Sequence, residues 1–182
     1  DNYELIFTDR LEAKIVSFPF FTPDGAFNAA GLKETILKNA KNGKIILLLN
    51  FPNNPAGYTP TIGEMKALPE AVKECADTGI DILSLSDDAY YGLFYEDGTE
   101  TQSCFSYLSS LHERVLAVKV DGSTKEDFVW GFRVAFMTFG SKGLTQDHYT
   151  ALNIKASGVL RTSISNSSRL AQSIMIRVMK SS

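Results

Sequence analysis

Residues 120–139 read VDGSTKEDFVWGFRVAFMTF and hold a single lysine, Lys125, in a short polar segment between two apolar runs. These runs, residues 115–120 and 134–139, predict two strands. Arg133 follows Lys125 by eight residues, at the start of the second run. A lysine at a strand end can form a Schiff base with an aldehyde cofactor, and an arginine beside it can bind that cofactor's phosphate. The alternative is that Lys125 is a solvated loop lysine.

The composition predicts one sizeable globular domain. The chain has 182 residues, of which 44% are hydrophobic, and a net charge of −3, which is enough apolar material for a core. It has no basic stripe with interleaved aromatics, so we expect no nucleic-acid partner. No apolar run is long enough to cross a bilayer. The cysteines and histidines are isolated and lack metal-ligand spacing, so we expect no metal site and a reducing, cytoplasmic setting.

Strand and helix patterns alternate along the chain. Residues 44–49, KIILLL, form an apolar run bounded by turn residues, which is typical of a strand buried in a parallel sheet. Thr61 and Glu64 have the spacing of a capping box at the start of a helix that ends near residue 77. Further strands are expected at residues 14–18 and 80–86, further helices at 28–39, 145–160 and 167–179, and irregular structure at 92–112. This order predicts a three-layer α/β/α fold around a mostly parallel sheet.

Three polar clusters directly follow predicted strands. They are residues 53–55 (NNP), residues 87–90 (DDAY) and residues 123–125 (STK). Because ligands bind beyond the carboxyl ends of parallel strands, we expect these clusters to share one crevice. The first two clusters also have structural alternatives: turn formation for the asparagines, helix capping for Asp87, and a half-buried tyrosine with a satisfied hydroxyl for Tyr90.

The three clusters carry a resemblance to a known family. The segments NFPNNPAG (50–57), SDDAY (86–90) and STK (123–125), with Arg133 eight residues after Lys125, occur in this order. Together they resemble the large domain of the fold-type I, class I and II aminotransferases, which use pyridoxal 5′-phosphate. The resemblance covers nearly the whole chain. It implies that residues 1–182 form a single domain, part of the cofactor-binding large domain, without the N-terminal segment and the C-terminal small domain.

The resemblance implies a role for each matching residue. Lys125 would carry the lysine aldimine with pyridoxal phosphate and later move a proton. Arg133 would bind the cofactor phosphate, and Asp87 would pair with the pyridine nitrogen. Tyr90 and Asn54 would hydrogen-bond the phenolic oxygen of the cofactor. The bond between Asn54 and Pro55 is expected to be cis, which an X-Pro bond adopts at little cost.

Other positions match the family less closely. A serine or threonine of the family that contacts the phosphate is replaced by Gly122, so Ser123 or a backbone N–H is expected to substitute for it. Arg161 matches an arginine that reaches the substrate across the dimer in aspartate-type members; the alternative is a helix-end arginine near carbonyl groups. Two acidic residues directly follow Lys125 and would favour its charged form unless they point away.

The activity implied by the resemblance is transfer of an amino group between an amino acid and a 2-keto acid, in a homodimer. Two alternatives stay open. One is another reaction on the same scaffold, a β-lyase or a decarboxylase. The other is the sensing domain of a transcription regulator. The sequence begins without methionine and stops within a helical pattern, so we expect a piece of a longer protein that by itself binds the cofactor poorly and does not turn over.

Overall fold

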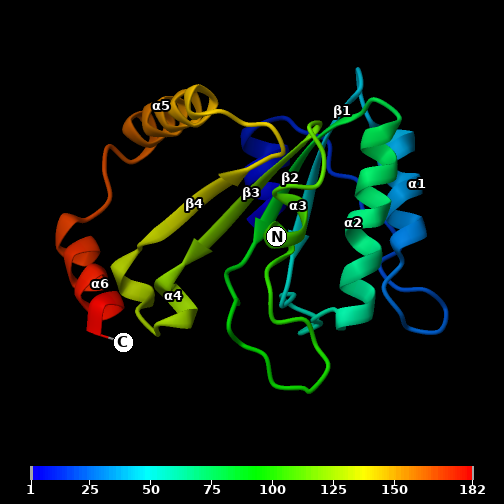
Figure 1. The fold of residues 1–182 in the computed structure, drawn as a ribbon. Coiled ribbons are helices and arrows are strands. Elements are labelled where there is room, and N and C mark those ends of the chain that lie inside the picture. Colours follow the sequence, from blue (N-terminus) through cyan, green and yellow to red (C-terminus); the bar gives the residue numbers. More distant parts are fainter. Residues whose placement is uncertain (1, 182) are drawn as a thin grey trace.

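A computed structural model describes residues 2–181, so the two end residues lie outside the structure. Four strands form one sheet in the order β1-β2-β3-β4 (Figure 1). The first three, β1 (Lys44–Asn50), β2 (Asp81–Asp87) and β3 (Val115–Gly122), run parallel, and β4 (Ala135–Gly140) is antiparallel to β3. The predicted α/β fold with a mostly parallel sheet is therefore confirmed.

The strand register aligns the carboxyl ends of the parallel strands. Asn50 of β1 pairs with Asp87 of β2, and Asp87 pairs with Val120 of β3. Because side chains alternate along a strand, Asp87 and its neighbour Asp88 point to opposite faces of the sheet. The polar clusters that follow the strands consequently start side by side.

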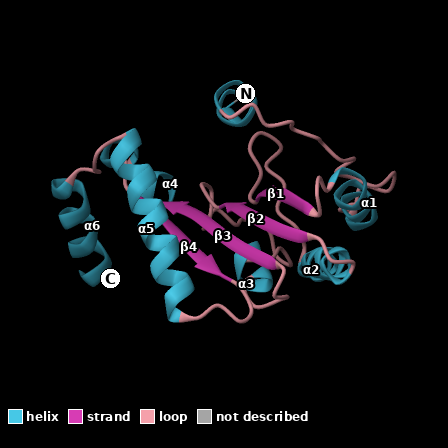
Figure 2. Cartoon of the chain, turned by 90° about the horizontal axis from the view of Figure 1, so that it is seen from above, coloured by secondary structure: helices cyan, strands magenta, loops and turns pink. Residues whose placement is uncertain are grey.

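Helices cover one face of the sheet. The helices α1 (Ala29–Asn39), α2 (Ile62–Asp77) and α3 (Cys104–Leu108) lie on the same side in Figure 2. Their apolar sides pack with alternate residues of β1, β2 and β3 into one core, whose fully buried members include Leu32, Ile36, Met65, Leu68, Val72, Ile82, Leu108 and Val115. Burying each of these large side chains stabilises the fold by roughly 1.5–3 kcal/mol.

The start of α2 confirms the predicted capping box. The hydroxyl of Thr61 accepts a hydrogen bond from the Glu64 N–H at 3.2 Å, and the Glu64 carboxylate accepts one from the Thr61 N–H at 2.8 Å. The second carboxylate oxygen of Glu64 accepts from the N–H of Phe27 at 2.8 Å. One side chain thus caps α2 and also ties down the loop that precedes α1.

The opposite face of the sheet meets the N-terminal segment. A π-helix, η1 (Glu4–Arg10), lies on this side, across the sheet from α1 and α2 (Figure 2). Between this segment and the sheet is a groove of about 1620 Å³, lined by Tyr3, Phe7 and the strand residues Ile46, Leu48, Leu83 and Leu116 among others. The side chain of Asp87 belongs to this face, by its alternation with Leu83.

The C-terminal third forms an arm of helices. Short turns α4 (Ser123–Glu126) and η2 (Trp130–Phe132) precede β4, and α5 (Gln146–Ser163) and α6 (Arg169–Ser181) follow it (Figure 1). Ala171 and Met175 of α6 pack on Val134 beside η2 in a small second cluster. No residue of α5 is buried. The predicted helices 145–160 and 167–179 are confirmed with slightly shifted ends.

Two local predictions were wrong. Residues 14–18 form no strand, since the structure gives them no pairing partner in residues 2–181. Residues 92–112 are not wholly irregular, because Ser103 accepts a hydrogen bond from the Phe105 N–H at 3.1 Å and starts α3, which buries Cys104 and Leu108.

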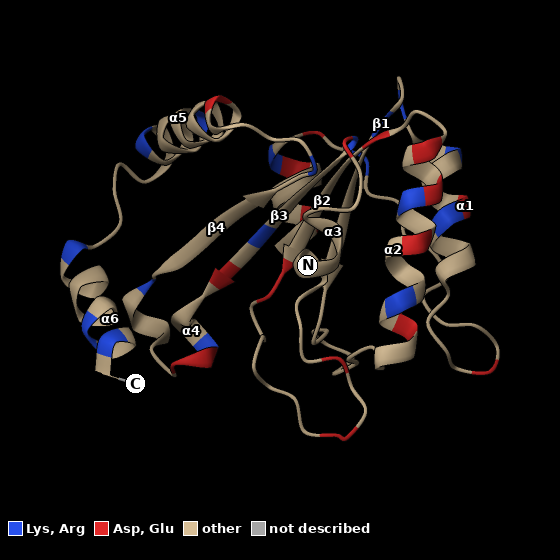
Figure 3. Ribbon diagram, in the orientation of Figure 1, with Lys and Arg blue, Asp and Glu red and all other residues tan. Residues whose placement is uncertain are grey.

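Charges of both signs are interspersed on α1 and α2 (Figure 3). Within residues 2–181, no helix is both long and apolar enough to span a bilayer.

Candidate functional site

Asn50 joins the first two polar clusters. This side chain is 7% exposed and lies at the end of β1. Its Nδ2 donates to the backbone carbonyl of Asp87 at 3.0 Å, and its Oδ1 accepts from the N–H of Asn54 at 2.9 Å. Both of these neighbours are predicted site residues, and the sequence did not point to Asn50 as their link. The expected convergence of these two strand ends is confirmed.

The loop after β1 separates the roles of its two asparagines. The peptide bonds Phe51–Pro52 and Asn54–Pro55 are cis, and the second of these was predicted. The Oδ1 of Asn53 accepts from the N–H of Ala56 at 3.1 Å, so this side chain serves the turn. The Asn54 side chain is exposed and makes no hydrogen bond to residues 2–181. Its carboxamide is therefore available for a ligand.

The Asp87 carboxylate has a donor on each oxygen. Oδ1 accepts from the N–H of Ala89 at 3.1 Å, which is the local turn bond that an Asp can make. Oδ2 accepts from the phenol of Tyr3 at 2.5 Å. Burial, followed by the hydrogen bond to Asp87, raises the pKa of Tyr3 above its ordinary value, so the phenol is neutral and donates. The alternative role of Asp87, capping of a helix, does not apply, since residues 89–92 form turns.

Lys125 lies beside Tyr90. Its Nζ is 4.8 Å from the centroid of the Tyr90 ring, within the range of a cation–π contact. Among the described residues no carboxylate lies within 4.0 Å of this amine, so the two acids that follow it do not hold it. Partial desolvation, with the nearby carboxylate of Asp121, raises the pKa of Glu126. The Tyr90 hydroxyl makes no hydrogen bond to the part of the chain that is described.

A second lysine near the strand ends has a different environment. Nζ of Lys119 is 2.6 Å from Oδ2 of Asp121 and 3.6 Å from Oδ2 of the buried Asp88. It also lies 4.6 Å from the centroid of the Tyr91 ring. Burial alone would lower the pKa of Lys119. The hydrogen bond to Asp121 and the charges of Asp121 and Asp88 outweigh this effect, so the net result is a raised pKa. Lys119 is thus committed to two carboxylates, whereas Lys125 is not.

The candidate phosphate ligands lie around the β3–β4 connection. Arg133 is exposed and in a left-handed conformation with φ 52°, and its Nη1 donates to the Trp130 carbonyl at 3.2 Å. The buried Ser123 hydroxyl donates to the Val134 carbonyl at 3.4 Å, a long bond. A Cβ at Gly122 would lie 3.1 Å from that same carbonyl oxygen. The close approach of the chain before β4 to the end of β3 therefore leaves little room for a side chain at residue 122.

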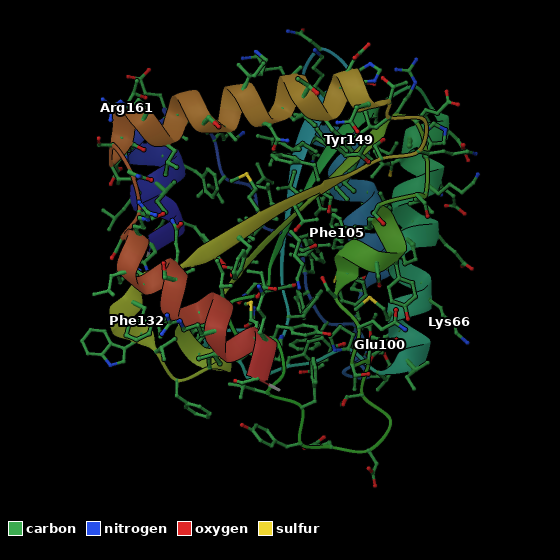
Figure 4. All side chains as sticks on the ribbon, turned by 60° about the vertical axis from the view of Figure 1, so that its left-hand side comes forward. Lys66, Glu100, Phe105, Phe132, Tyr149 and Arg161 are labelled. Carbon is green, nitrogen blue, oxygen red and sulfur yellow. The ribbon has the colours of Figure 1, made fainter. Side chains whose placement is uncertain are left out.

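Arg161 is not brought into contact with the strand-end residues. It lies in the last turn of α5 (Figure 4). Its side chain is exposed, and Nη1 donates to the Ser165 hydroxyl at 2.7 Å. Arg161 thus lies at the helix end, as in the alternative, but its hydrogen-bond partner is a hydroxyl and not a carbonyl group.

The polar side chains at the strand ends have the chemistry that binding of pyridoxal phosphate requires. Asp87 keeps unused lone pairs that can accept from a ring nitrogen, and Lys125 offers an amine without a carboxylate partner. Arg133 offers a guanidinium for the phosphate. Residues 2–181 hold no group of three or more His, Cys, Asp or Glu side chains that could hold a metal ion. Both cysteines, Cys75 and Cys104, are free and buried.

Comparisons with known proteins agree with this fit. The family model for aminotransferase class I and II matches residues 2–182. Among solved structures, an aminotransferase from Anaerococcus prevotii has a TM-score of 0.77 and 27% identity; the match covers 91% of this chain and 40% of that one. The alanine aminotransferase of Pyrococcus furiosus shares the fold with a TM-score of 0.58 at 19% identity, covering 79% of this chain and 33% of that one.

A mutant aspartate aminotransferase of Thermus thermophilus also shares the fold, with a TM-score of 0.56 and 22% identity over 84% of this chain and 36% of that one. A search of curated proteins gave no significant match. The chain spans less than half the length of the solved structures named here. A family match over residues 2–182 is decisive: the chain belongs to the class I and II aminotransferases.

Proposed function

We propose that the protein containing this chain is a pyridoxal-phosphate-dependent aminotransferase, and that it moves an amino group between an amino acid and a 2-keto acid. One observation carries the proposal. Asp87 is the last residue of β2, and Lys125 follows the end of the neighbouring strand β3. Tyr90, three residues after Asp87 in the sequence, contacts the amine of Lys125, which has no carboxylate partner among the described residues.

The residues at the strand ends would hold the cofactor at three points. Asp87 would accept a hydrogen bond from the protonated ring nitrogen on an unused lone pair. The Tyr90 hydroxyl and the Asn54 carboxamide, both without protein partners among the described residues, would donate to the phenolic oxygen. Arg133 would supply the charge for the phosphate and Ser123 a neutral donor. When bound, pyridoxal phosphate supplies an electron sink for a substrate carbanion.

Lys125 would act first as a nucleophile and then as a proton carrier. For both tasks Nζ must be neutral for part of the cycle. A fixed carboxylate partner would oppose this, because an opposite charge favours the ammonium form. The separation of Lys125 from carboxylates, in contrast to Lys119, is therefore what such a role requires.

The remaining parts of the proposal concern the whole protein. Residues 1–182 would be part of the large, cofactor-binding domain, with the N-terminal segment and small domain supplied by other residues. The protein would be a cytoplasmic homodimer, in which Arg161 reaches the substrate site of the partner subunit. Its exposed position at the end of α5 leaves it accessible for such a contact.

Product analysis tests the activity. The protein as its gene encodes it is incubated with pyridoxal phosphate, a panel of amino acids and a 2-keto acid acceptor. We expect a new keto acid and a new amino acid in equal amounts, and no more than one keto acid per active site without the acceptor. Lys125→Arg should abolish transfer, because a guanidinium cannot form the Schiff base, while Lys119→Arg, the matched lysine change, should retain it. Release of ammonia or carbon dioxide without an acceptor would instead indicate a lyase or a decarboxylase.

A further inference from the structure

The contact between Tyr3 and Asp87 joins two segments that are far apart in sequence. The phenol of Tyr3 donates to Oδ2 of Asp87 across a separation of 84 residues. Tyr3 directly precedes η1, which approaches the face of the sheet opposite α1 and α2. The ring of Phe7, one turn later, lies 6.3 Å from the Tyr3 ring. The N-terminal segment thus places a single hydroxyl on the carboxylate at the end of β2.

Asp87 is restrained by three hydrogen bonds, two to its carboxylate and one to its backbone carbonyl. Its Oδ1 accepts from Ala89 and its Oδ2 from Tyr3, while the backbone carbonyl of the same residue accepts from the side chain of Asn50. A carboxylate offers about four acceptor positions, so two are used and the others stay open. Loss of the Tyr3 bond would leave one local bond to set the side-chain torsion, and the open positions would no longer have a fixed direction.

We propose that Tyr3 is a positioning residue of the cofactor site: its hydroxyl fixes the Asp87 carboxylate so that an unused lone pair faces the ring nitrogen of a bound pyridine cofactor. The inference rests on the proposed function, because it needs a cofactor with such a nitrogen. It adds residues 2–10, which carry none of the predicted site residues, to the parts of the chain that build the site. The neutral phenol suits this task, since it donates to the carboxylate without bringing a charge that would compete with a protonated ring.

Removing one oxygen atom tests the proposal. Tyr3→Phe keeps the ring and deletes the donor. The matched control is Tyr107→Phe, which deletes a phenol–carboxylate hydrogen bond of the same 2.5 Å length, to Glu100, beside α3. Both are made in the protein as its gene encodes it. The readouts are the dissociation constant for pyridoxal phosphate and the ¹⁵N chemical shift of the ring nitrogen in labelled cofactor, neither of which requires turnover.

We expect Tyr3→Phe to weaken cofactor affinity about tenfold or more, the scale of a hydrogen bond to a charged group, and to move the ¹⁵N shift. Tyr107→Phe should change neither readout. In an Asp87→Asn background, Tyr3→Phe should have no further effect, because Tyr3 acts through Asp87.

Three results would overturn the assignment: wild-type affinity and ¹⁵N shift in Tyr3→Phe, a loss of affinity with an unmoved ¹⁵N shift, or a full effect in the Asp87→Asn background. A wild-type protein that binds no pyridoxal phosphate would refute the proposed function itself. That failure is seen before any variant is made and is therefore distinct from a failure at Tyr3.

Discussion

Replacing Asn50 by alanine should destabilise the protein, because this side chain is the bridge between two strand ends. The change removes a donor at 3.0 Å from the Asp87 carbonyl and an acceptor at 2.9 Å from the Asn54 N–H. It adds no bulk, so the cost comes from these two bonds and a small void at a position that is 7% exposed.

The two bonds contribute unequally. Asn54 is exposed, so water can replace the lost acceptor, and this bond contributes about 0.5–1 kcal/mol. The carbonyl of Asp87 is partly buried, and leaving it without its donor costs about 1–2 kcal/mol. We therefore expect the free energy of unfolding to fall by about 1.5–3 kcal/mol.

Urea unfolding followed by circular dichroism measures this loss. With a slope of about 1–3 kcal/mol per molar urea, the midpoint should fall by roughly 0.5–3 M at an unchanged slope. The control is Asn39→Ala, which removes a single carboxamide bond, to the Thr35 carbonyl at 2.8 Å, at the end of α1. It should cost about 1 kcal/mol or less. Equal effects at the two asparagines, or no effect at Asn50, would refute the bridging role.

Three further changes test other parts of the structure. Glu64→Ala should lower the free energy of unfolding by about 1–3 kcal/mol, since it removes both the cap of α2 and the tie to the loop before α1; an unchanged melting temperature would contradict this. Gly122→Ser should lower the free energy of unfolding by about 1–3 kcal/mol, because the new Cβ would crowd the Val134 carbonyl. It should not tighten cofactor binding. A variant of wild-type stability that binds the cofactor more tightly would show that the crowding is unimportant. Burial raises the pKa of the Asp88 carboxyl group. The folded protein therefore binds the carboxyl proton of Asp88 more tightly than the unfolded chain does. The contribution of Asp88 to stability consequently falls as pH rises above about 4. The melting temperature of Asp88→Asn relative to wild type should therefore rise between pH 4 and pH 7; a constant difference would refute the assignment.

Features that depend on neighbouring residues were predictable from the sequence. The run at residues 44–49 became β1, and the spacing of Thr61 and Glu64 became the capping box of α2. The three polar clusters lie at aligned strand ends because parallel strands share their direction. In each case a local pattern determined the result.

Features that depend on distant partners were not predictable. Residues 14–18 have strand composition, but a strand needs a neighbour to pair with, and none is provided by residues 2–181. Tyr3 contacts Asp87 across 84 residues, and no spacing rule joins them. Asn50 could have been found only from the register that sets it beside Asp87. The site's supporting bonds are therefore a product of the tertiary fold.

The identity of the reactive amine is the most direct test of the proposed site. The protein is incubated with pyridoxal phosphate and reduced with borohydride, which fixes the cofactor on the lysine with which it has condensed. Peptide mapping then locates the added mass. We predict the label on Lys125, the amine that contacts Tyr90 and has no carboxylate partner among the described residues. A label on Lys119 or Lys142 would contradict the proposed site.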